Sequence, residues 1–285
     1  MKIWRMAGLA VLSALLLPLG LILGSVSIPW SELWSENFST ILWQIRFPRT
    51  VASYLGGSAL AVSGLILQTI FHNPLAEPFV LGISSGALTG SVMLIMLGML
   101  PSFWNILMGS FGGAMLVTLI ILMVAHTVMS RQALLLIGLM AGYFLSALIN
   151  ILVVFAPASD VKDYHIWTLG SFARVLPEYL PVYAAAIVVL VGFSFILSKM
   201  MNGLMMGPEY AQSIGISIRR YRVILLLISS LLTAVVTAYA GPIGFIGLTA
   251  PHIARLIFRT SDHKLLIPGG MLIGGNLLLG CDILA

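Results

Sequence analysis

Long apolar runs separated by short polar segments form the dominant pattern of this 285-residue chain. A helix needs roughly 20 apolar residues to cross the hydrocarbon core of a bilayer. Apolar runs, most of them of that length, are bounded by charges, prolines and polar clusters at residues 5–24, 50–71, 79–100, 104–127, 132–156, 178–198, 221–240, 244–258 and 265–285. The pattern predicts an all-α, polytopic bundle of about nine transmembrane helices in a single domain, residues 1–285.

Two of these runs are unusual. The run 244–258 is short and contains Pro251, which predicts a kinked or incompletely spanning helix. Within the first run, the apolar residues from Met6 to Leu23 follow Lys2 and Arg5 and are longer than the apolar core of a signal peptide, so we expect a retained first helix. Small residues recur at helix-packing spacing, which predicts closely packed helices there, at Gly82, Gly86 and Gly90 and at Gly270 and Gly274.

Composition supports a membrane protein. Hydrophobic residues make up 60% of the chain and charged residues only 8%, whereas soluble domains carry roughly 25% charged residues. The net charge of +5 does not indicate nucleic-acid binding, because the basic residues lie between the apolar runs. With a cytoplasmic N-terminus, ten lysines and arginines fall inside and four outside, namely Arg46, Arg49, Lys162 and Arg174. This bias predicts that orientation.

Catalytic chemistry finds little support in the sequence. Gly82-Ile83-Ser84-Ser85-Gly86 fits the nucleophile-elbow pattern of hydrolases, but that motif needs a preceding strand and a nearby base. The candidate base, His252, lies in a distant segment, so a helix break or close packing is the favoured interpretation. No metal site is predicted, because the histidines are scattered without ligand spacing, at His72, His126, His165, His252 and His263.

Motifs that could supply energy for work across a membrane are scarce in the sequence. No lysine follows a glycine, so the chain has no phosphate-binding loop and is not expected to hydrolyse ATP. Asp282 is the main ionisable residue predicted inside a span, whereas an ion-driven carrier usually needs several. An ion-coupled secondary transporter and an intramembrane serine hydrolase stay open as alternatives. A subunit driven by a partner ATPase fits better.

Several stretches, in order along nearly the whole chain, resemble the permease family of iron-siderophore and cobalamin importers. They are Arg46-Phe47-Pro48-Arg49-Thr50, Gly64-Leu65-Ile66-Leu67-Gln68, Asn73-Pro74-Leu75-Ala76-Glu77-Pro78, Leu81-Gly82-Ile83-Ser84-Ser85-Gly86-Ala87, Trp167-Thr168-Leu169-Gly170-Ser171, residues 209–222, Ala240-Gly241-Pro242-Ile243-Gly244-Phe245-Ile246-Gly247-Leu248, Ala250-Pro251-His252-Ile253-Ala254-Arg255 and Asp282. Each stretch alone is weakly specific, and the set is highly specific.

The resemblance implies a type II ATP-binding-cassette (ABC) importer in the bacterial cytoplasmic (inner) membrane, working by alternating access without a cofactor. Two permease copies form a homodimer within the lipid, two separate ATPase subunits drive it, and an extracytoplasmic binding protein delivers the substrate. An iron(III)-siderophore is the favoured cargo, with haem and cobalamin as alternatives. Family members have ten membrane helices, so the resemblance implies a tenth helix, and a third docking arginine, beyond Ala285.

The resemblance also implies roles for particular residues. Arg46 and Arg49 match arginines that dock acidic residues of the binding protein, a pairing that suits the forked guanidinium. A cytoplasmic loop at about 199–220 matches the segment that contacts the ATPase, through Glu209, Ala211, Gly215, Arg219 and Arg220. A glycine between two short helices is expected to allow its sharp turn. Small residues suited to a wide, weakly binding passage are Gly82, Ser84, Ser85, Gly86, Gly138 and Gly142.

Overall fold

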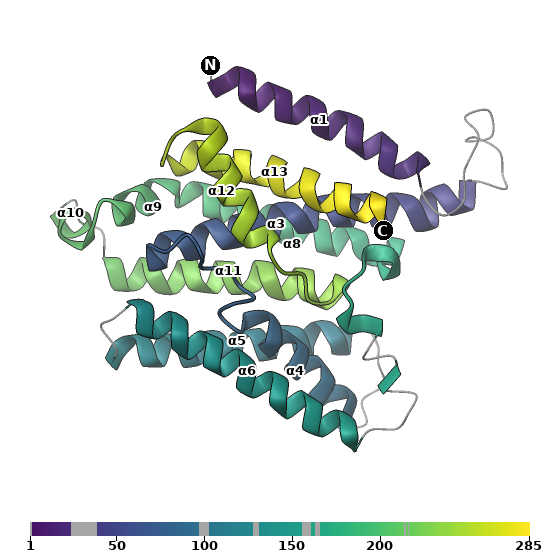
Figure 1. Cartoon of the computed structure of the whole chain (residues 1–285), viewed down its shortest axis with the longest axis horizontal. Coiled ribbons are helices and arrows are strands. Elements are labelled where there is room, and N and C mark those ends of the chain that lie inside the picture. The colour runs from purple at the N-terminus through teal and green to yellow at the C-terminus, as the bar shows by residue number, and fades with distance from the viewer. Residues whose placement is uncertain are drawn as a thin grey trace.

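The computed structural model describes residues 2–23, 39–96, 103–127, 131–155, 161–162, 166–213, 215 and 217–285. Regular secondary structure in these residues is helical (Figure 1). The longer helices are α1 (Lys2–Ile22), α3 (Phe47–Phe71), α5 (Phe103–Thr127), α6 (Arg131–Val154), α8 (Leu180–Ile196), α11 (Ile218–Ala240) and α13 (His263–Leu284). The shorter elements are the π-helix η2 (Ile41–Arg46), α4 (Ile83–Met96), the 3₁₀ turns η3 (Phe172–Arg174) and η4 (Pro177–Tyr179), α9 (Ser198–Met205), α10 (Pro208–Ser213) and α12 (Ile246–Phe258).

The predicted helical bundle is confirmed. Seven helices in the described part of the chain are long and apolar enough to cross a membrane, by length and composition. Each of the nine apolar runs contains a helix, and the two shorter apolar helices are α4 and α12. The short helix predicted around Pro251 is therefore present as α12, with that proline inside it.

The third run forms a shorter helix than its apolar length predicts. Gly82 has φ +71°, a left-handed conformation that an α-helix cannot include, so α4 begins only at Ile83. The segment before α12 also contains left-handed residues, Gly241 (φ +76°) and Phe245 (φ +68°). Two long helices, α3 and α11, are thus each followed by a non-helical segment and then a short apolar helix.

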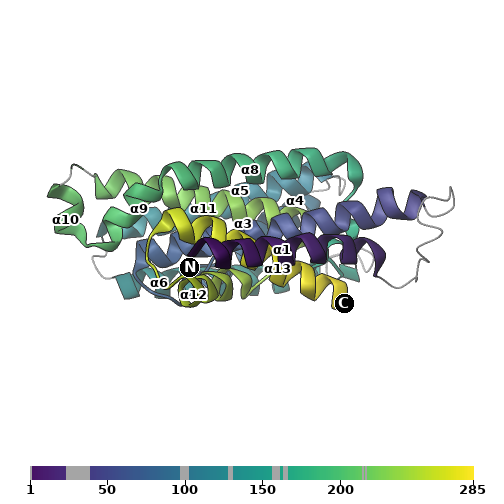
Figure 2. The ribbon, with the colours of Figure 1, turned by 90° about the horizontal axis from the view of Figure 1, so that it is seen from above.

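The helices α3 and α11 form the centre of the bundle. About four fifths of the apolar stretch of each is buried, 83% for α3 and 78% for α11, against 6% for α1 and 17% for α6. Helices α1, α13 and α12 lie on one side of this pair and α4, α5 and α6 on the other (Figure 1). A turned view shows α8 and α12 on opposite faces of it (Figure 2). The outer helices therefore carry most of the exposed apolar surface of the bundle.

Small residues allow the backbones of neighbouring helices to touch. A Cβ atom on Gly90 of α4 would lie 2.0 Å from the carbonyl oxygen of Gly109 on α5, and one on Gly274 of α13 would lie 2.3 Å from that of Gly57 on α3. The predicted close packing is confirmed at these positions. It is wrong for Gly270, since a Cβ atom there would have no neighbour within 4 Å from another element in the described part of the chain.

Buried hydroxyl pairs add specific contacts between helices. Ser63 of α3 lies 2.7 Å from the hydroxyl of Ser229 and 3.0 Å from that of Thr233, both on α11. Thr118 of α5 donates to Ser230 of α11 at 2.5 Å. In a bilayer such hydrogen bonds, together with close packing, hold helices together, because the lipid tails compete poorly for polar groups.

Candidate functional site

Arg46 lies at one end of the bundle, which we call the arginine end and define by Arg46, Arg49 and Asp282. Its side chain is only 7% exposed. The Nη1 atom donates to the carbonyl oxygens of Leu21, at 3.0 Å, and Ile22, at 2.6 Å. The last carbonyls of a helix have no partner within the helix and carry its negative dipole end, so a cation stabilises them. Arg46 therefore attaches the C-terminal end of α1 to η2.

Arg49 pairs with Asp282 at the same end. Its Nε atom lies 3.1 and 2.9 Å from the two carboxylate oxygens of Asp282, and Nη2 donates to the backbone oxygen of that residue at 2.9 Å. The Arg49 side chain is nevertheless 32% exposed, against 12% for Asp282. The pair joins the first turn of α3 to the last turn of α13 while part of the guanidinium stays accessible.

The sequence placed the start of the second membrane helix at residue 50, because charges usually mark span boundaries. The structure extends this helix back through η2, so Arg46 and Arg49 lie within it. The reason is that both cations find partners on neighbouring helices, the carbonyls of α1 and the carboxylate of Asp282. Their role in docking a partner protein stays a prediction.

Glu77, between α3 and α4, was not singled out by the sequence as a functional residue. It is 4% exposed, and its carboxylate accepts hydrogen bonds from the backbone N–H groups of Phe245 and Leu248, at the start of α12. Burial raises the pKa of Glu77, and the two N–H groups oppose that rise. The carboxylate of Glu77 thus binds the N-terminal end of a short helix. An acidic residue between Ala76 and Pro78, next to an apolar run, was the available signal.

The raised pKa of Glu77 should make the folding stability of the protein depend on pH. In the folded state Glu77 holds its proton to higher pH than in the unfolded chain, so its contribution to folding stability falls as pH rises from about 4.5 through the raised pKa. Glu77→Gln does not titrate, and its melting temperature minus that of the unmodified protein should grow between pH 4.5 and pH 7.5. Thermal unfolding in detergent measures this, with exposed Glu178→Gln as control. A pH-independent difference would contradict it.

The residues predicted to line a passage are mostly buried where α4 meets its neighbours. A Cβ atom on Gly82 would lie 2.8 Å from the backbones of Gly138 and Gly142 on α6. Ser85 is partly buried, 3.5 Å from the hydroxyl of Ser146. These contacts bring the predicted residues of α4 and α6 together. Their role in a pathway stays a prediction.

The serine-hydrolase alternative loses support here. Ser84 is 1% exposed, and its hydroxyl has no hydrogen-bond partner among the described residues. A serine nucleophile needs a base within hydrogen-bonding reach. His252 lies exposed on α12.

The loop predicted at 199–220 forms the opposite end of the bundle, which we call the α10 end. It consists of α9, α10 and the first turn of α11. The glycine between the two short helices is Gly207, with φ +108°, whereas Gly215, with φ +81°, lies between α10 and α11. Two glycines therefore provide the turns where the sequence suggested one. Glu209 lies in α10, Ala211 is fully buried, and Arg219 and Arg220 are exposed on α11.

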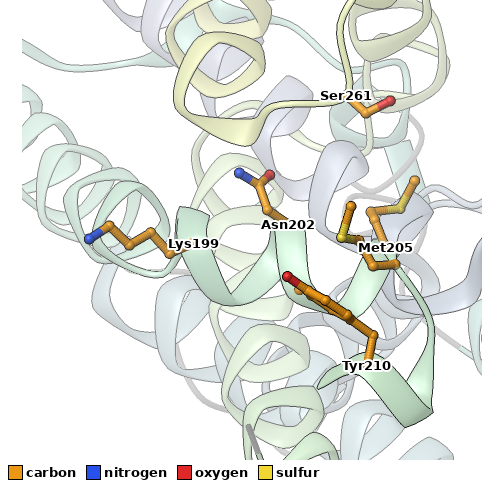
Figure 3. A pocket seen from close by; sticks show the side chains of 7 residues that line it. Lys199, Asn202, Met205, Tyr210 and Ser261 are labelled. Atoms are coloured by element: carbon orange, nitrogen blue, oxygen red, sulfur yellow. The ribbon is translucent and has the colours of Figure 1, made fainter. Parts of the chain in front are cut away.

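A pocket of about 590 Å³ opens at the α10 end. It is bounded by α9, α10 and the turn between α12 and α13, and Figure 3 shows its lining side chains. The residues that line it are Lys199, Asn202, Gly203, Met205, Met206, Tyr210 and Ser261. Apolar and aromatic side chains thus lie beside a single cation.

Comparisons with known proteins agree with this geometry. Residues 11–285 match the model of the FecCD transport family. The chain is 39% identical, over 98% of its own length and 84% of the relative, to the vitamin B12 import system permease protein BtuC of Klebsiella pneumoniae. It is 38% identical to the protein of the same description in Escherichia coli, over 97% and 85% of the two chains.

A solved structure agrees with the fold. The chain superposes with a TM-score of 0.88 and 26% identity, over all of this chain and 90% of the other, on a transporter assigned to the metal-chelate type of ABC transporter, in an inward-facing conformation.

A polytopic helical bundle with these relatives is a membrane transport permease. The chain belongs to the FecCD transport family, within the metal-chelate importers of the ABC class. The resemblance stated from the sequence motifs is therefore confirmed, and with it the expectation that the chain is a transporter subunit whose ATP is hydrolysed by a separate chain.

Proposed function

We propose that this chain is the permease subunit of an importer that carries cobalamin across the bacterial inner membrane. The observation that carries the proposal is the identity of 38–39%, over nearly the whole chain, to vitamin B12 import permeases. Closely packed helix contacts at Gly57 and Gly274 and the buried core of α3 and α11 provide the rigid bundle that alternating access requires.

Within this proposal the permease works as a homodimer with two ATPase subunits and an extracytoplasmic binding protein. The α10 end faces the cytoplasm, together with the N-terminus. Its exposed basic residues support this orientation, because lysine and arginine are enriched on the cytoplasmic side of membrane proteins. These residues are Lys199, Arg219, Arg220, Arg259 and Lys264.

The ATPase binds at the α10 end, through the loop that contains Glu209, Ala211, Gly215, Arg219 and Arg220. The exposed arginines and Lys199 favour an acidic partner surface, and the pocket beside Met206 and Tyr210 favours an apolar side chain of that partner. The binding protein docks at the arginine end. The exposed part of Arg49 is the contact that the geometry supports best there.

A ferric siderophore is the second candidate cargo. The motifs quoted above are shared by siderophore and cobalamin permeases, so they support both. The predicted pathway residues, such as Gly82, Ser85 and Gly142, are small and uncharged and so favour neither cargo, and they pack between α4 and α6 in this conformation.

Uptake by cells that express this chain with its own ATPase and binding protein distinguishes the two cargoes. Import of labelled cyanocobalamin should be competed by unlabelled cyanocobalamin and not by a ferric siderophore in equal excess. Import that only the siderophore competes for would replace cobalamin with the second candidate.

A further prediction concerns Gly215. Its φ of +81° costs a residue with a side chain about 1–2 kcal/mol, and a β-branched residue more, while no other part of the described structure lies within 4 Å of the Cβ position, its two chain neighbours aside. Gly215→Val should therefore distort the turn without a clash. We expect the amount of substrate imported per ATP hydrolysed to fall about tenfold, because the distorted turn would transmit the movement of the ATPase poorly. The control is Gly192→Ala, which also has open space at Cβ. If Gly215→Val imported as much substrate per ATP as the unmodified protein, the turn at Gly215 would have no role in coupling ATP hydrolysis to transport.

A further inference from the structure

The strongest unassigned feature is a series of partly buried polar contacts that connects α9 with the membrane helices and ends in the buried pair of His263 and Thr69. Asn202 on α9 accepts hydrogen bonds from the backbone nitrogen of His263, at 2.8 Å, and from its Nδ1 atom, at 2.6 Å. The Asn202 amide nitrogen donates to Asp262 at 2.7 Å. Both ends of the amide are thus used, which fixes α9 against the first turn of α13.

His263 continues the chain into the centre of the bundle. It is 1% exposed, and its Nε2 atom lies 2.7 Å from the hydroxyl of Thr69 on α3. Since the oxygen of Asn202 can only accept, Nδ1 carries a proton, and Nε2 of a neutral ring can only accept. The single hydroxyl proton of Thr69 is then shared between Nε2 and the carbonyl oxygen of Leu65, 2.8 Å away. The imidazole therefore bridges α9 and α3 through one defined tautomer.

The end of α3 is connected onward to α12. Gln68, next to Thr69, accepts from Nη1 of Arg255 at 2.5 Å and donates to the backbone oxygen of Gly247 at 3.3 Å.

Asp262 also stabilises the beginning of α13, by accepting from the backbone nitrogen of Lys264 at 3.1 Å. The amide of Asn202 lowers the pKa of Asp262, since a hydrogen bond donated to a carboxylate favours its charged form.

Asn202 also lines the pocket at the α10 end, beside Met205 and opposite Ser261 (Figure 3). A protein segment that moves α9 from the pocket side would therefore act on the amide of Asn202. In the described residues, the side-chain hydrogen bonds between α9 and the membrane helices run through this amide.

We propose that Asn202, His263 and Thr69 are positioning residues that transmit movement of the ATPase-contacting loop into α13 and α3. The inference rests on the proposed function, because it assumes that an ATPase moves α9. This series of hydrogen bonds differs from an ordinary packing contact because it joins the cytoplasmic loop to the most buried helix. Breaking it should therefore reduce the coupling of ATP hydrolysis to transport more than the assembly of the complex.

The test compares two identical substitutions in the complex of permease, ATPase and binding protein reconstituted in lipid vesicles. Thr69→Val removes the hydroxyl that meets His263, and Thr118→Val removes one that meets Ser230. Both hydroxyls also lie 2.8 Å from the carbonyl oxygen four residues earlier, so both valine variants lose the same hydrogen bond within their own helix. Thr69→Ser keeps the hydroxyl.

We expect Thr69→Val to lower substrate imported per ATP about tenfold, with the complex intact and ATP still hydrolysed, and Thr69→Ser to restore it. Thr118→Val should change this ratio less than about twofold. Equal losses in the two valine variants, or none in Thr69→Val, would overturn the proposal. Absence of ATP-driven uptake by the unmodified complex would instead refute the proposed function, so the two failures are distinguishable.

Discussion

Replacing Gly64 by alanine is expected to prevent stable folding of the bundle. A Cβ atom at this position would lie 1.8 Å from the carbonyl oxygen of Gly247 and 2.6 Å from its Cα atom, so the clash is with backbone. Overpacking that side chains can relieve costs about 1–3 kcal/mol. Here α3 and the start of α12 must move apart, and we expect a loss of more than about 3 kcal/mol.

The matched control is Gly192→Ala on α8, where no described residue of a neighbouring element lies within 4 Å of the Cβ position. That substitution should leave stability unchanged or raise it, because alanine favours a helix by about 1 kcal/mol over glycine. Size-exclusion profiles in mild detergent and thermal unfolding measure both variants. A Gly64→Ala protein as stable as the control would show that α3 and α12 are not in backbone contact.

Neutralising Arg49 is expected to weaken capture of the binding protein by about a hundredfold, since removing one partner of a buried charge pair at an interface commonly costs about 2–5 kcal/mol. Two substitutions can separate the internal role of Arg49, its pair with Asp282, from its contact with the binding protein. Arg49 holds Asp282, so Arg49→Gln removes both the internal ion pair and any external contact, whereas Asp282→Asn removes only the internal pair.

Affinity of the purified binding protein for the permease–ATPase complex in lipid measures the difference. We expect Arg49→Gln to lose affinity and Asp282→Asn to keep it. If Arg49→Gln and Asp282→Asn bound the binding protein with equal affinity, Arg49 would have only its internal role of pairing with Asp282.

Reversing the charge of Arg46 and Arg49 together should also abolish docking. Arg46→Glu would in addition place a carboxylate against the carbonyls of Leu21 and Ile22, so its stability must be measured alongside.

Much of the fold follows from the pattern of apolar runs, because a bilayer allows few other structures. The limits of α5, predicted at 104–127, and α11, predicted at 221–240, agree with the structure to within a few residues. The start of α4 could not be predicted from apolarity, because the length of an apolar run does not report the left-handed conformation at Gly82. The small residues at 82–86 gave the better signal, since they favoured a helix break or close packing there.

The candidate site was only partly predictable. Arg46 and Arg49 were recognised by a motif, but their partners are 24 to 233 residues away in sequence, and no local pattern reports such pairs. Glu77 and the contacts of His263 were missed for the same reason. A lone histidine at a membrane boundary usually indicates a solvated residue, whereas here Asn202 and Thr69 bury it.

ATP-driven uptake by the assembled importer tests the account most directly. The chain is reconstituted with its ATPase in lipid vesicles, and labelled cyanocobalamin is supplied with the binding protein on the side of the arginine end. We predict accumulation on the side of the α10 end that requires ATP there and stops when the ATPase or binding protein is left out. Uptake that follows an ion gradient without ATP, or no uptake of any metal chelate, would contradict the account.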